Sequence, residues 1–217
     1  LNSAIRREAN SGEASWSLMA YFARVNYSYL DKYLLSASYR REGSSRFGLN
    51  NKWGNFPGIS AGWVISEMDF FNLDAINNLK IRASYGATGR EDISPLLSMA
   101  TYNTHSYYNM EGEWLRSWGP SGNPNPDLKW EVGTNTNIGL DVITLKEKLS
   151  FSVDLYNRTT KDLLFYTPTP KPPYIYGNTW SNVGSIQNRG IEFVVDWSAV
   201  KTTDFQYSTS IVGSYGK

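Results

Sequence analysis

The chain has 217 residues, of which 21 are Lys or Arg and 20 are Asp or Glu, so its formal net charge is +1. This balance supplies no clustered positive field of the kind that binds nucleic-acid phosphates, and we expect no nucleic-acid partner. The sequence contains no cysteine, which excludes disulfides, thiolate metal sites and a cysteine nucleophile.

Phe, Trp and Tyr make up 15% of the chain, although its mean hydropathy is negative. A transmembrane β-barrel combines these two properties, because aromatic belts lie at both membrane interfaces while every second strand residue faces a polar lumen. A soluble domain could also use the aromatic residues as a core or as a sugar-binding platform. No stretch of about 18 apolar residues is present, so we expect no transmembrane helix.

Apolar and polar residues alternate with a period of two over most of the chain, which predicts antiparallel β-strands. About eight such strands are expected. They cover residues 15–30, 33–42, 56–66, 79–86, 128–142, 148–158, 185–198 and 205–215. Most of them reach the length of about 9–11 residues that a strand needs to cross a membrane. The predicted fold class is therefore an all-β, antiparallel transmembrane β-barrel.

The connections between these strands alternate in length. Short connections are expected at residues 31–32, 67–78, 144–147 and 200–204, and long ones at 43–55, 87–127 and 159–184. Bacterial outer-membrane barrels follow this rule, with short periplasmic turns and long extracellular loops. The alternation predicts that Gly43, Trp114 and Tyr176 lie outside the cell.

Charged residues indicate which face of each strand meets lipid. In the strand at residues 79–86, Leu79, Ile81 and Tyr85 alternate with Lys80 and Arg82. Placing Arg or Lys against lipid costs about 2–4 kcal/mol at the membrane midplane, so the charged side is expected to face the lumen. By this criterion the lumen-facing candidates are Arg24, Arg40, Arg82, Glu131 and Asp154.

Aromatic residues are frequent in the two longest loops. They are Tyr107, Tyr108, Trp114 and Trp118 in one loop, and Tyr174, Tyr176 and Trp180 in the other. Aromatic faces can stack on sugars or pack against a covering protein, so these residues are candidates for substrate or lid contact. Packing of the loops against one another is the alternative for the same residues.

The sequence gives little support for a catalytic site. His105 is the only histidine, and it lies in a polar, Tyr-rich loop without a G-x-S-x-G motif. A single histidine without cysteine also makes a transition-metal site a poor fit. We therefore expect no enzyme activity, no metal and no cofactor.

Four segments resemble signatures of the SusC/RagA-type TonB-dependent transporters, and they occur in the family's order. Residues 40–48 read R-R-E-G-S-S-R-F-G, residues 79–86 read L-K-I-R-A-S-Y-G, residues 125–131 read N-P-D-L-K-W-E, and residues 184–192 read G-S-I-Q-N-R-G-I-E. One such motif is weak evidence, whereas four in order, on independently placed strands, favour the family strongly.

This resemblance implies a barrel of about 22 strands with an N-terminal plug. It also implies a SusD-like surface lipoprotein as a lid and the TonB complex as energy source for import of oligosaccharides or peptides across the outer membrane. Residues 1–217 are then expected to be part of the later half of such a barrel, without the plug domain and without the C-terminal strand, in contact with the remaining strands and with outer-membrane lipid.

Two other readings remain open at this point. One is a small, closed outer-membrane barrel that acts as an adhesin or enzyme, for which a ladder between the first and last strands would be evidence. The other is a soluble all-β carbohydrate-binding module that uses the aromatic loops.

Overall fold

The computed structural model describes residues 13–217, except the side chains at 105, 106 and 201. The strands are β1 (Leu18–Tyr29), β2 (Tyr33–Ser44), β3 (Trp53–Val64), β4 (Ile76–Arg90), β5 (Tyr102–Met110), β6 (Glu113–Pro120), β7 (Glu131–Thr144), β8 (Leu149–Lys161), β9 (Leu164–Pro168), β10 (Asn178–Asn182), β11 (Ser185–Lys201) and β12 (Gln206–Gly216). A single 3₁₀ turn, η1 (Ile65–Glu67), follows β3. Within the described range, no helix has the length and apolar character needed to cross a membrane.

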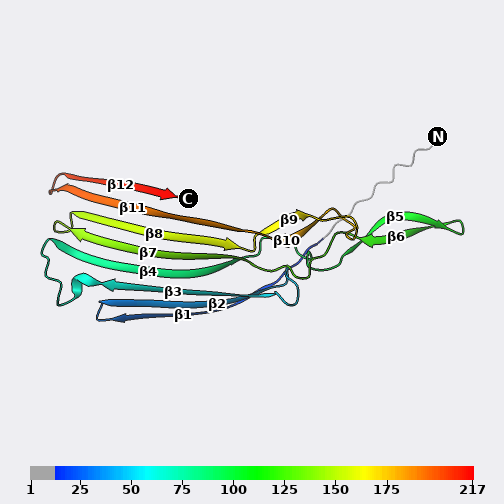
Figure 1. Cartoon of the computed structure of the whole chain (residues 1–217), viewed down its shortest axis with the longest axis horizontal. Coiled ribbons are helices and arrows are strands. Elements are labelled where there is room, and N and C mark those ends of the chain that lie inside the picture. Colours follow the sequence, from blue (N-terminus) through cyan, green and yellow to red (C-terminus); the bar gives the residue numbers. More distant parts are fainter. Residues whose placement is uncertain (1–12) are drawn as a thin grey trace.

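Eight of the strands form one antiparallel sheet in the order β1-β2-β3-β4-β7-β8-β11-β12 (Figure 1). Each strand pairs with the next one of this sheet along the chain, so the sheet is a meander. These are the eight strands predicted from the alternation, and the all-β antiparallel class is confirmed. The structure adds two separate hairpins, β5–β6 and β9–β10, within the segments that were expected to be loops.

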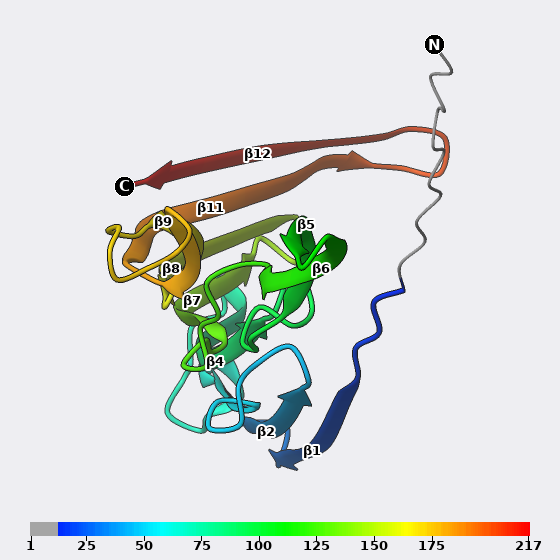
Figure 2. The same cartoon turned by 90° about the vertical axis from the view of Figure 1, so that its right-hand side faces the viewer.

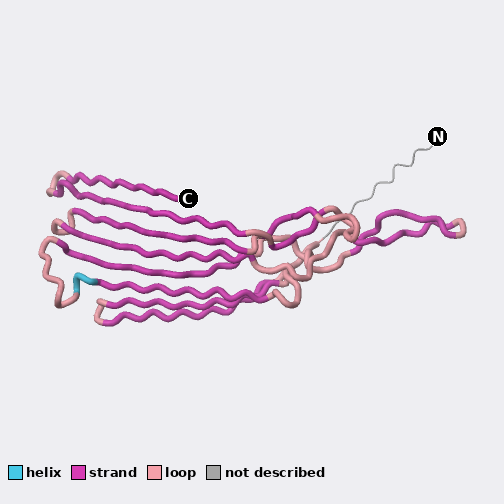
Figure 3. The backbone as a smooth tube through the Cα atoms, viewed as in Figure 1, coloured by secondary structure: helices cyan, strands magenta, loops and turns pink. Residues whose placement is uncertain are grey.

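The two longest connections, residues 91–130 and 162–184, lie at the same end of the sheet, as predicted, but the expected alternation fails at β3, where the connection to β4 (65–75) is longer than the loop from β2 (45–52). The turns after β1, β7 and β11 and the η1 connection lie at one end of the sheet, and the β2–β3 loop and the two longest segments lie at the other, with the β5–β6 hairpin projecting beyond them (Figures 1 and 3). In the first turn, Leu30 (φ 52°) and Asp31 (φ 53°) both have positive φ, and the Lys32 N–H donates to the carbonyl of Tyr29 at 3.1 Å. This geometry matches the twist of the flanking strands and permits a connection of three residues, Leu30–Lys32.

The sheet has two chemically different faces, which the strand register makes explicit. One row of paired residues contains Tyr27, Leu35, Ala61, Ala83, Ile138, Leu155 and Ile191. The adjacent row contains Asn26, Ser36, Ser60, Ser84, Asn137 and Tyr156. Because successive side chains of a strand point to opposite sides, these rows define an apolar face and a polar face.

The sheet curves into an open arc, with β1 at one end and β12 at the other (Figure 2). Among residues 13–217, no ladder joins β1 to β12. A closed barrel of these strands would require that ladder, so the small-barrel reading is not supported. Both edge strands present backbone groups to whatever lies beside them.

The buried core lies at the loop end of the sheet. It is a cluster of Phe47, Phe56, Ile93, Leu128 and Trp130, which we call the loop-end core. The Trp130 ring meets Phe56 edge-on at 5.5 Å between centroids and lies 5.1 Å from Phe47. Aromatic pairs at these separations stabilise a core beyond the area that they bury.

Candidate functional site

The polar face carries an ion-pair cluster that joins three strands. The Arg82 guanidinium on β4 donates to Asp141 on β7 at 2.6 and 2.9 Å, and to Asp154 on β8 at 3.1 Å. Ser152 donates to Asp141 at 2.8 Å. Two of the candidate lumen residues, Arg82 and Asp154, are therefore direct partners on one face.

Gly139 makes this bridge possible. It lies between Arg82 and Asp154 in the register, on the intervening strand β7. A Cβ atom at this position would lie 2.7 Å from Nη2 of Arg82 and 2.6 Å from Oδ1 of Asp154. The missing side chain leaves the space that the guanidinium occupies.

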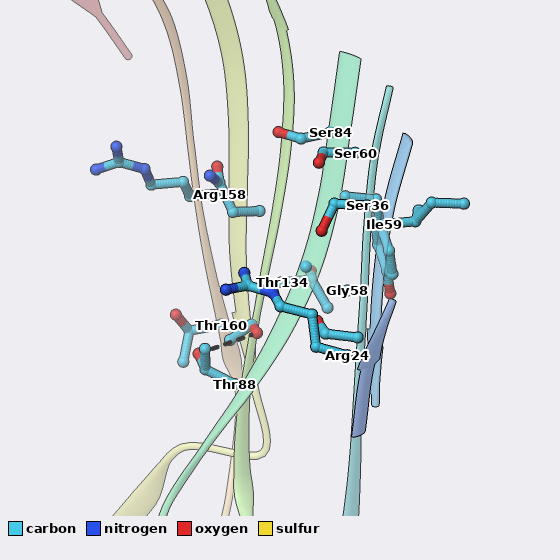
Figure 4. Close-up of a pocket in the computed structure, with 15 residues that line it drawn as sticks. Arg24, Ser36, Gly58, Ile59, Ser60, Ser84, Thr88, Thr134, Arg158 and Thr160 are labelled. Carbon is cyan, nitrogen blue, oxygen red and sulfur yellow. Dashed lines mark hydrogen bonds between the residues drawn. The ribbon is translucent and has the colours of Figure 1, made fainter. Parts of the chain in front are cut away.

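A hollow of about 520 Å³ lies next to this cluster on the polar face. Its lining includes Arg24, Arg158 and a series of hydroxyl and amide side chains. In Figure 4 the Arg24 and Arg158 side chains lie on one side of the sheet, and Ile59 points to the other. The Thr88 hydroxyl donates to the carbonyl of Gly133 at 3.4 Å, which links β4 and β7 at the hollow.

The other two lumen candidates lie nearer the loops. Arg40 pairs with the buried carboxylate of Glu42. Glu131 is 8% exposed, accepts the Leu164 N–H at 3.1 Å, and lies 3.7 Å from the Arg90 guanidinium. Glu131 thus ties the start of β9 to the wall.

Two of the signature segments meet at the loop-end core. Trp130 Nε1 donates to the carbonyl of Lys52 at 3.1 Å, and Asn51 Nδ2 donates to the carbonyl of Asp127 at 3.0 Å. A Cβ atom on Gly48 would lie 1.9 Å from the carbonyl oxygen of Pro126, so only glycine permits this approach. The last glycine of R-R-E-G-S-S-R-F-G, Gly48, therefore has a packing role against N-P-D-L-K-W-E.

Asparagine side chains lock the β9–β10 segment onto residues 121–130. Asn123 Nδ2 donates to the carbonyls of Tyr176 and Asn178 at 2.7 and 3.1 Å, and its Oδ1 accepts the Tyr176 N–H at 3.2 Å. Asn125 Nδ2 donates to the carbonyl of Trp180 at 2.8 Å, and Asn182 exchanges two hydrogen bonds with the Lys129 backbone. We call these three asparagines the loop clamps.

The candidate aromatic residues fall into two groups. Tyr107, Tyr108, Trp114 and Trp118 lie on the β5–β6 hairpin and are exposed, the two tryptophans each by 69%. Tyr174 is also exposed. Tyr176, in contrast, donates its hydroxyl to the carbonyl of Pro120 at 2.5 Å, and Trp180 packs against the loop-end core.

Several residues of this region were not identified from the sequence. The loop clamps and Arg158 belong to this set, because their roles depend on pairings across long stretches of chain. The β5–β6 hairpin did have a local signal: Glu111 and Gly112 form its turn with positive φ, between two runs rich in aromatic residues. An X-Gly pair between such runs is a hairpin signature.

Within residues 13–217, no group of three or more His, Asp or Glu side chains is placed to hold a metal ion. The side chain of His105 lies outside the described residues. The arrangement supports binding along a polar wall, through guanidinium, hydroxyl and amide groups, and anchoring of loops at one end.

A meandering antiparallel sheet of long strands, with one apolar and one polar face and with its longest loops at one end, is the wall of an outer-membrane-type β-barrel. The model of the family described as TonB dependent receptor-like, beta-barrel matches residues 2–216, and the chain belongs to this family.

Known relatives agree with this assignment. The chain is 42% identical over 202 residues to TonB-dependent receptor P39 of Formosa agariphila, covering 93% of this chain and 19% of the relative. It is 33% identical over 209 residues to TonB-dependent receptor SusC of Bacteroides thetaiotaomicron, covering 94% and 21%. The chain thus spans about a fifth of the length of the curated relatives that it matches.

The fold also matches solved structures. The RagAB peptide importer in its "open-open" state superposes with a TM-score of 0.84 at 27% identity, over 93% of this chain and 22% of that chain. The resemblance to SusC/RagA-type transporters inferred from the motifs is therefore confirmed.

Proposed function

We propose that this chain forms part of the wall and extracellular loops of a transporter that imports oligosaccharides or peptides across the outer membrane. The observation that carries the proposal is the two-faced sheet of strands that are 11 to 17 residues long. Strands of this length give an apolar face tall enough to cover the lipid core of a membrane. The opposite face suits a polar lumen, since it carries Arg24, Arg40, Arg82, Glu131 and Asp154.

The proposal includes partners. The open edges at β1 and β12 call for neighbouring barrel strands, because unpaired backbone groups are too costly in lipid. A SusD-like surface lipoprotein would cover the loop end, and the TonB complex would supply energy. Membership of a family of TonB-dependent receptors supports both partners. The same membership supports a transport role and not an enzymatic one.

The exposed aromatic residues of the β5–β6 hairpin, together with Tyr174, are the proposed contacts with substrate or lid. An isolated two-stranded hairpin is marginally stable in water, so a covering surface would stabilise this one. Tyr176 and Trp180 would act indirectly, by fixing the loops that carry the other aromatic residues.

The proposal is tested in the native organism with the full-length protein. We expect the protein in the outer-membrane fraction and expect its extraction to require detergent. Cells that lack the gene should lose uptake of one class of oligosaccharide or peptide and retain uptake of free glucose. Recovery of the native protein in the soluble fraction would refute the proposal.

A further inference from the structure

One register row of the polar face has an arginine at each end. From β1 to β8 it runs through Arg24, Ser38, Gly58, Gly86, Asn135 and Arg158. Because residues that pair in this way lie side by side on the same face, the two guanidinium groups flank a stretch of small and polar residues. We call these six residues the arginine row.

The middle of the arginine row is open. Gly86 has nothing within 4 Å of the position where a Cβ atom would lie, and Gly58 faces the hydroxyl of Ser38. Hydroxyl side chains border this bare backbone. They are Ser36, Ser60 and Ser84 on one side and Thr88 and Thr160 on the other. Figure 4 shows this hollow, which has hydrogen-bonding groups along its length.

The two arginines differ from the other arginines of the polar face. Arg82, Arg40 and Arg90 each have a carboxylate partner. In the described part of the chain, by contrast, no carboxylate lies within ion-pair distance of Arg24 or Arg158.

Arg158 lies over the ring of Tyr156, 5.1 Å from its centroid. This contact orients the guanidinium and leaves its N–H donors for another acceptor.

We propose that the arginine row binds an acidic oligosaccharide, with carboxylate or sulfate groups on Arg24 and Arg158 and sugar hydroxyls on the side chains between them. Guanidinium groups bind planar oxyanions through charge-assisted hydrogen bonds. This inference rests on the proposed import function and specifies its substrate class.

The lining favours a sugar over a peptide. Extended peptides are recognised through pockets for alternate side chains. The arginine row offers hydroxyl groups, an amide and bare backbone, whereas the apolar side chain of Ile59 lies on the opposite face (Figure 4). A polyhydroxylated ligand matches this lining.

The length of the arginine row requires a ligand of several sugar units. Five strand spacings separate Arg24 from Arg158, which corresponds to about 24 Å along the sheet at ~4.8 Å per spacing. A single sugar cannot reach both arginines, so the ligand must carry anionic groups on separate units.

The test measures binding to the full-length transporter in detergent by calorimetry at low salt. The probes are a chondroitin sulfate hexasaccharide, an oligogalacturonide hexamer, neutral maltohexaose and hexaglutamate. The variants are Arg24→Gln, Arg158→Gln and Gly86→Val, the last of which adds a side chain to the open floor. Lys148→Gln removes a charge from the distant turn between β7 and β8 and is the matched control.

At least one of the two acidic oligosaccharides should bind more tightly than maltohexaose, and each arginine variant should weaken that binding about tenfold, the cost of one charge-assisted hydrogen bond. Gly86→Val should also weaken it, and Lys148→Gln should not. Unchanged affinity in the arginine variants, or equal affinity for maltohexaose, would overturn the inference. Equal affinity for hexaglutamate that depends on both arginines would reassign the row to acidic peptides.

Failure here is distinguishable from failure of the import function. A transporter that resides in the outer membrane and takes up neutral oligosaccharides, without a role for either arginine, would retain the proposed function and lose only the acidic specificity. A protein without outer-membrane residence would lose the import function, whatever its affinities.

Discussion

Arg82 on β4 donates a hydrogen bond to Asp154 on β8 at 3.1 Å, although β7 lies between the two strands. The contact crosses two strand spacings, which is beyond the reach of direct neighbours in a sheet. It exists because the intervening position, Gly139, has no side chain. Three strands of the wall are thus joined by one guanidinium group.

Gly139→Ala should break this bridge. The added methyl group would lie within 3 Å of both Arg82 and Asp154, so the ion pair must separate. We expect a loss of about 1–3 kcal/mol, seen as a lower thermal unfolding midpoint of the detergent-solubilised full-length protein by circular dichroism. Gly86→Ala, where the added atom has open space, is the control. An unchanged midpoint for Gly139→Ala would contradict this account.

Phe47→Ala should loosen the loop end without disturbing the sheet. Phe47 is fully buried in the loop-end core, and truncation of such a side chain costs about 3–5 kcal/mol. Because the cost falls on the loops, limited proteolysis should cut residues 91–130 faster while the barrel stays intact. Phe165→Ala, at a side chain that is 51% exposed, should leave the cleavage rate unchanged. Equal rates in the two variants would count against a separate loop core.

Asn123→Asp should release the β9–β10 segment. The carboxylate keeps an acceptor for the Tyr176 N–H but loses the N–H donors that bond the carbonyls of Tyr176 and Asn178. Hydrogen exchange measured by mass spectrometry should then accelerate over residues 169–180. Asn103→Asp, on the exposed strand β5, is the matched control. Unchanged protection over 169–180 would mean that other contacts hold the segment.

The two faces of the sheet predict opposite responses to the same substitution at neighbouring positions. Ile138→Arg places a charge on the apolar face and should cost about 2–4 kcal/mol if that face meets lipid near the midplane. Asn137→Arg places it on the polar face and should be tolerated. The amount of folded protein in the outer membrane, read from heat-modifiable mobility on gels, compares the two. Equal assembly of both variants would refute the assignment of faces.

The eight wall strands were predictable because each one carries its own period-two pattern and pairs with the next in the sheet. The strand expected at residues 33–42 is Tyr33–Ser44, and the one expected at 185–198 is Ser185–Lys201. The alternation within each strand predicts the strand, and the chain order of the strands predicts their order in the sheet. No information on long-range contacts was therefore needed to predict the wall. The β9–β10 and β5–β6 hairpins were missed because their segments were read for loop composition and length, and the turn signal at Glu111 and Gly112 was overlooked.

The candidate site was less predictable. The pairing of Arg82 with Asp154 follows from the assignment of both residues to the polar face and from the absence of a side chain at Gly139 between them. The contact of Asn123 with Tyr176, in contrast, joins residues that are 53 positions apart and share no sequence pattern. The direction of Trp180 into the loop-end core likewise depends on how the loops fold together. Whether the exposed aromatic residues contact substrate or lid stays a prediction.

The consecutive strand order has a consequence for how such a wall can be assembled. Every new strand pairs with the last one added, so a growing sheet always offers a template edge and never needs a strand threaded between two others. The conformational entropy lost on closing a loop is small at the short turns and is largest across residues 91–130 and 162–184. The two longest loops, and not the wall, should therefore set the pace at which this part of the protein reaches its native state.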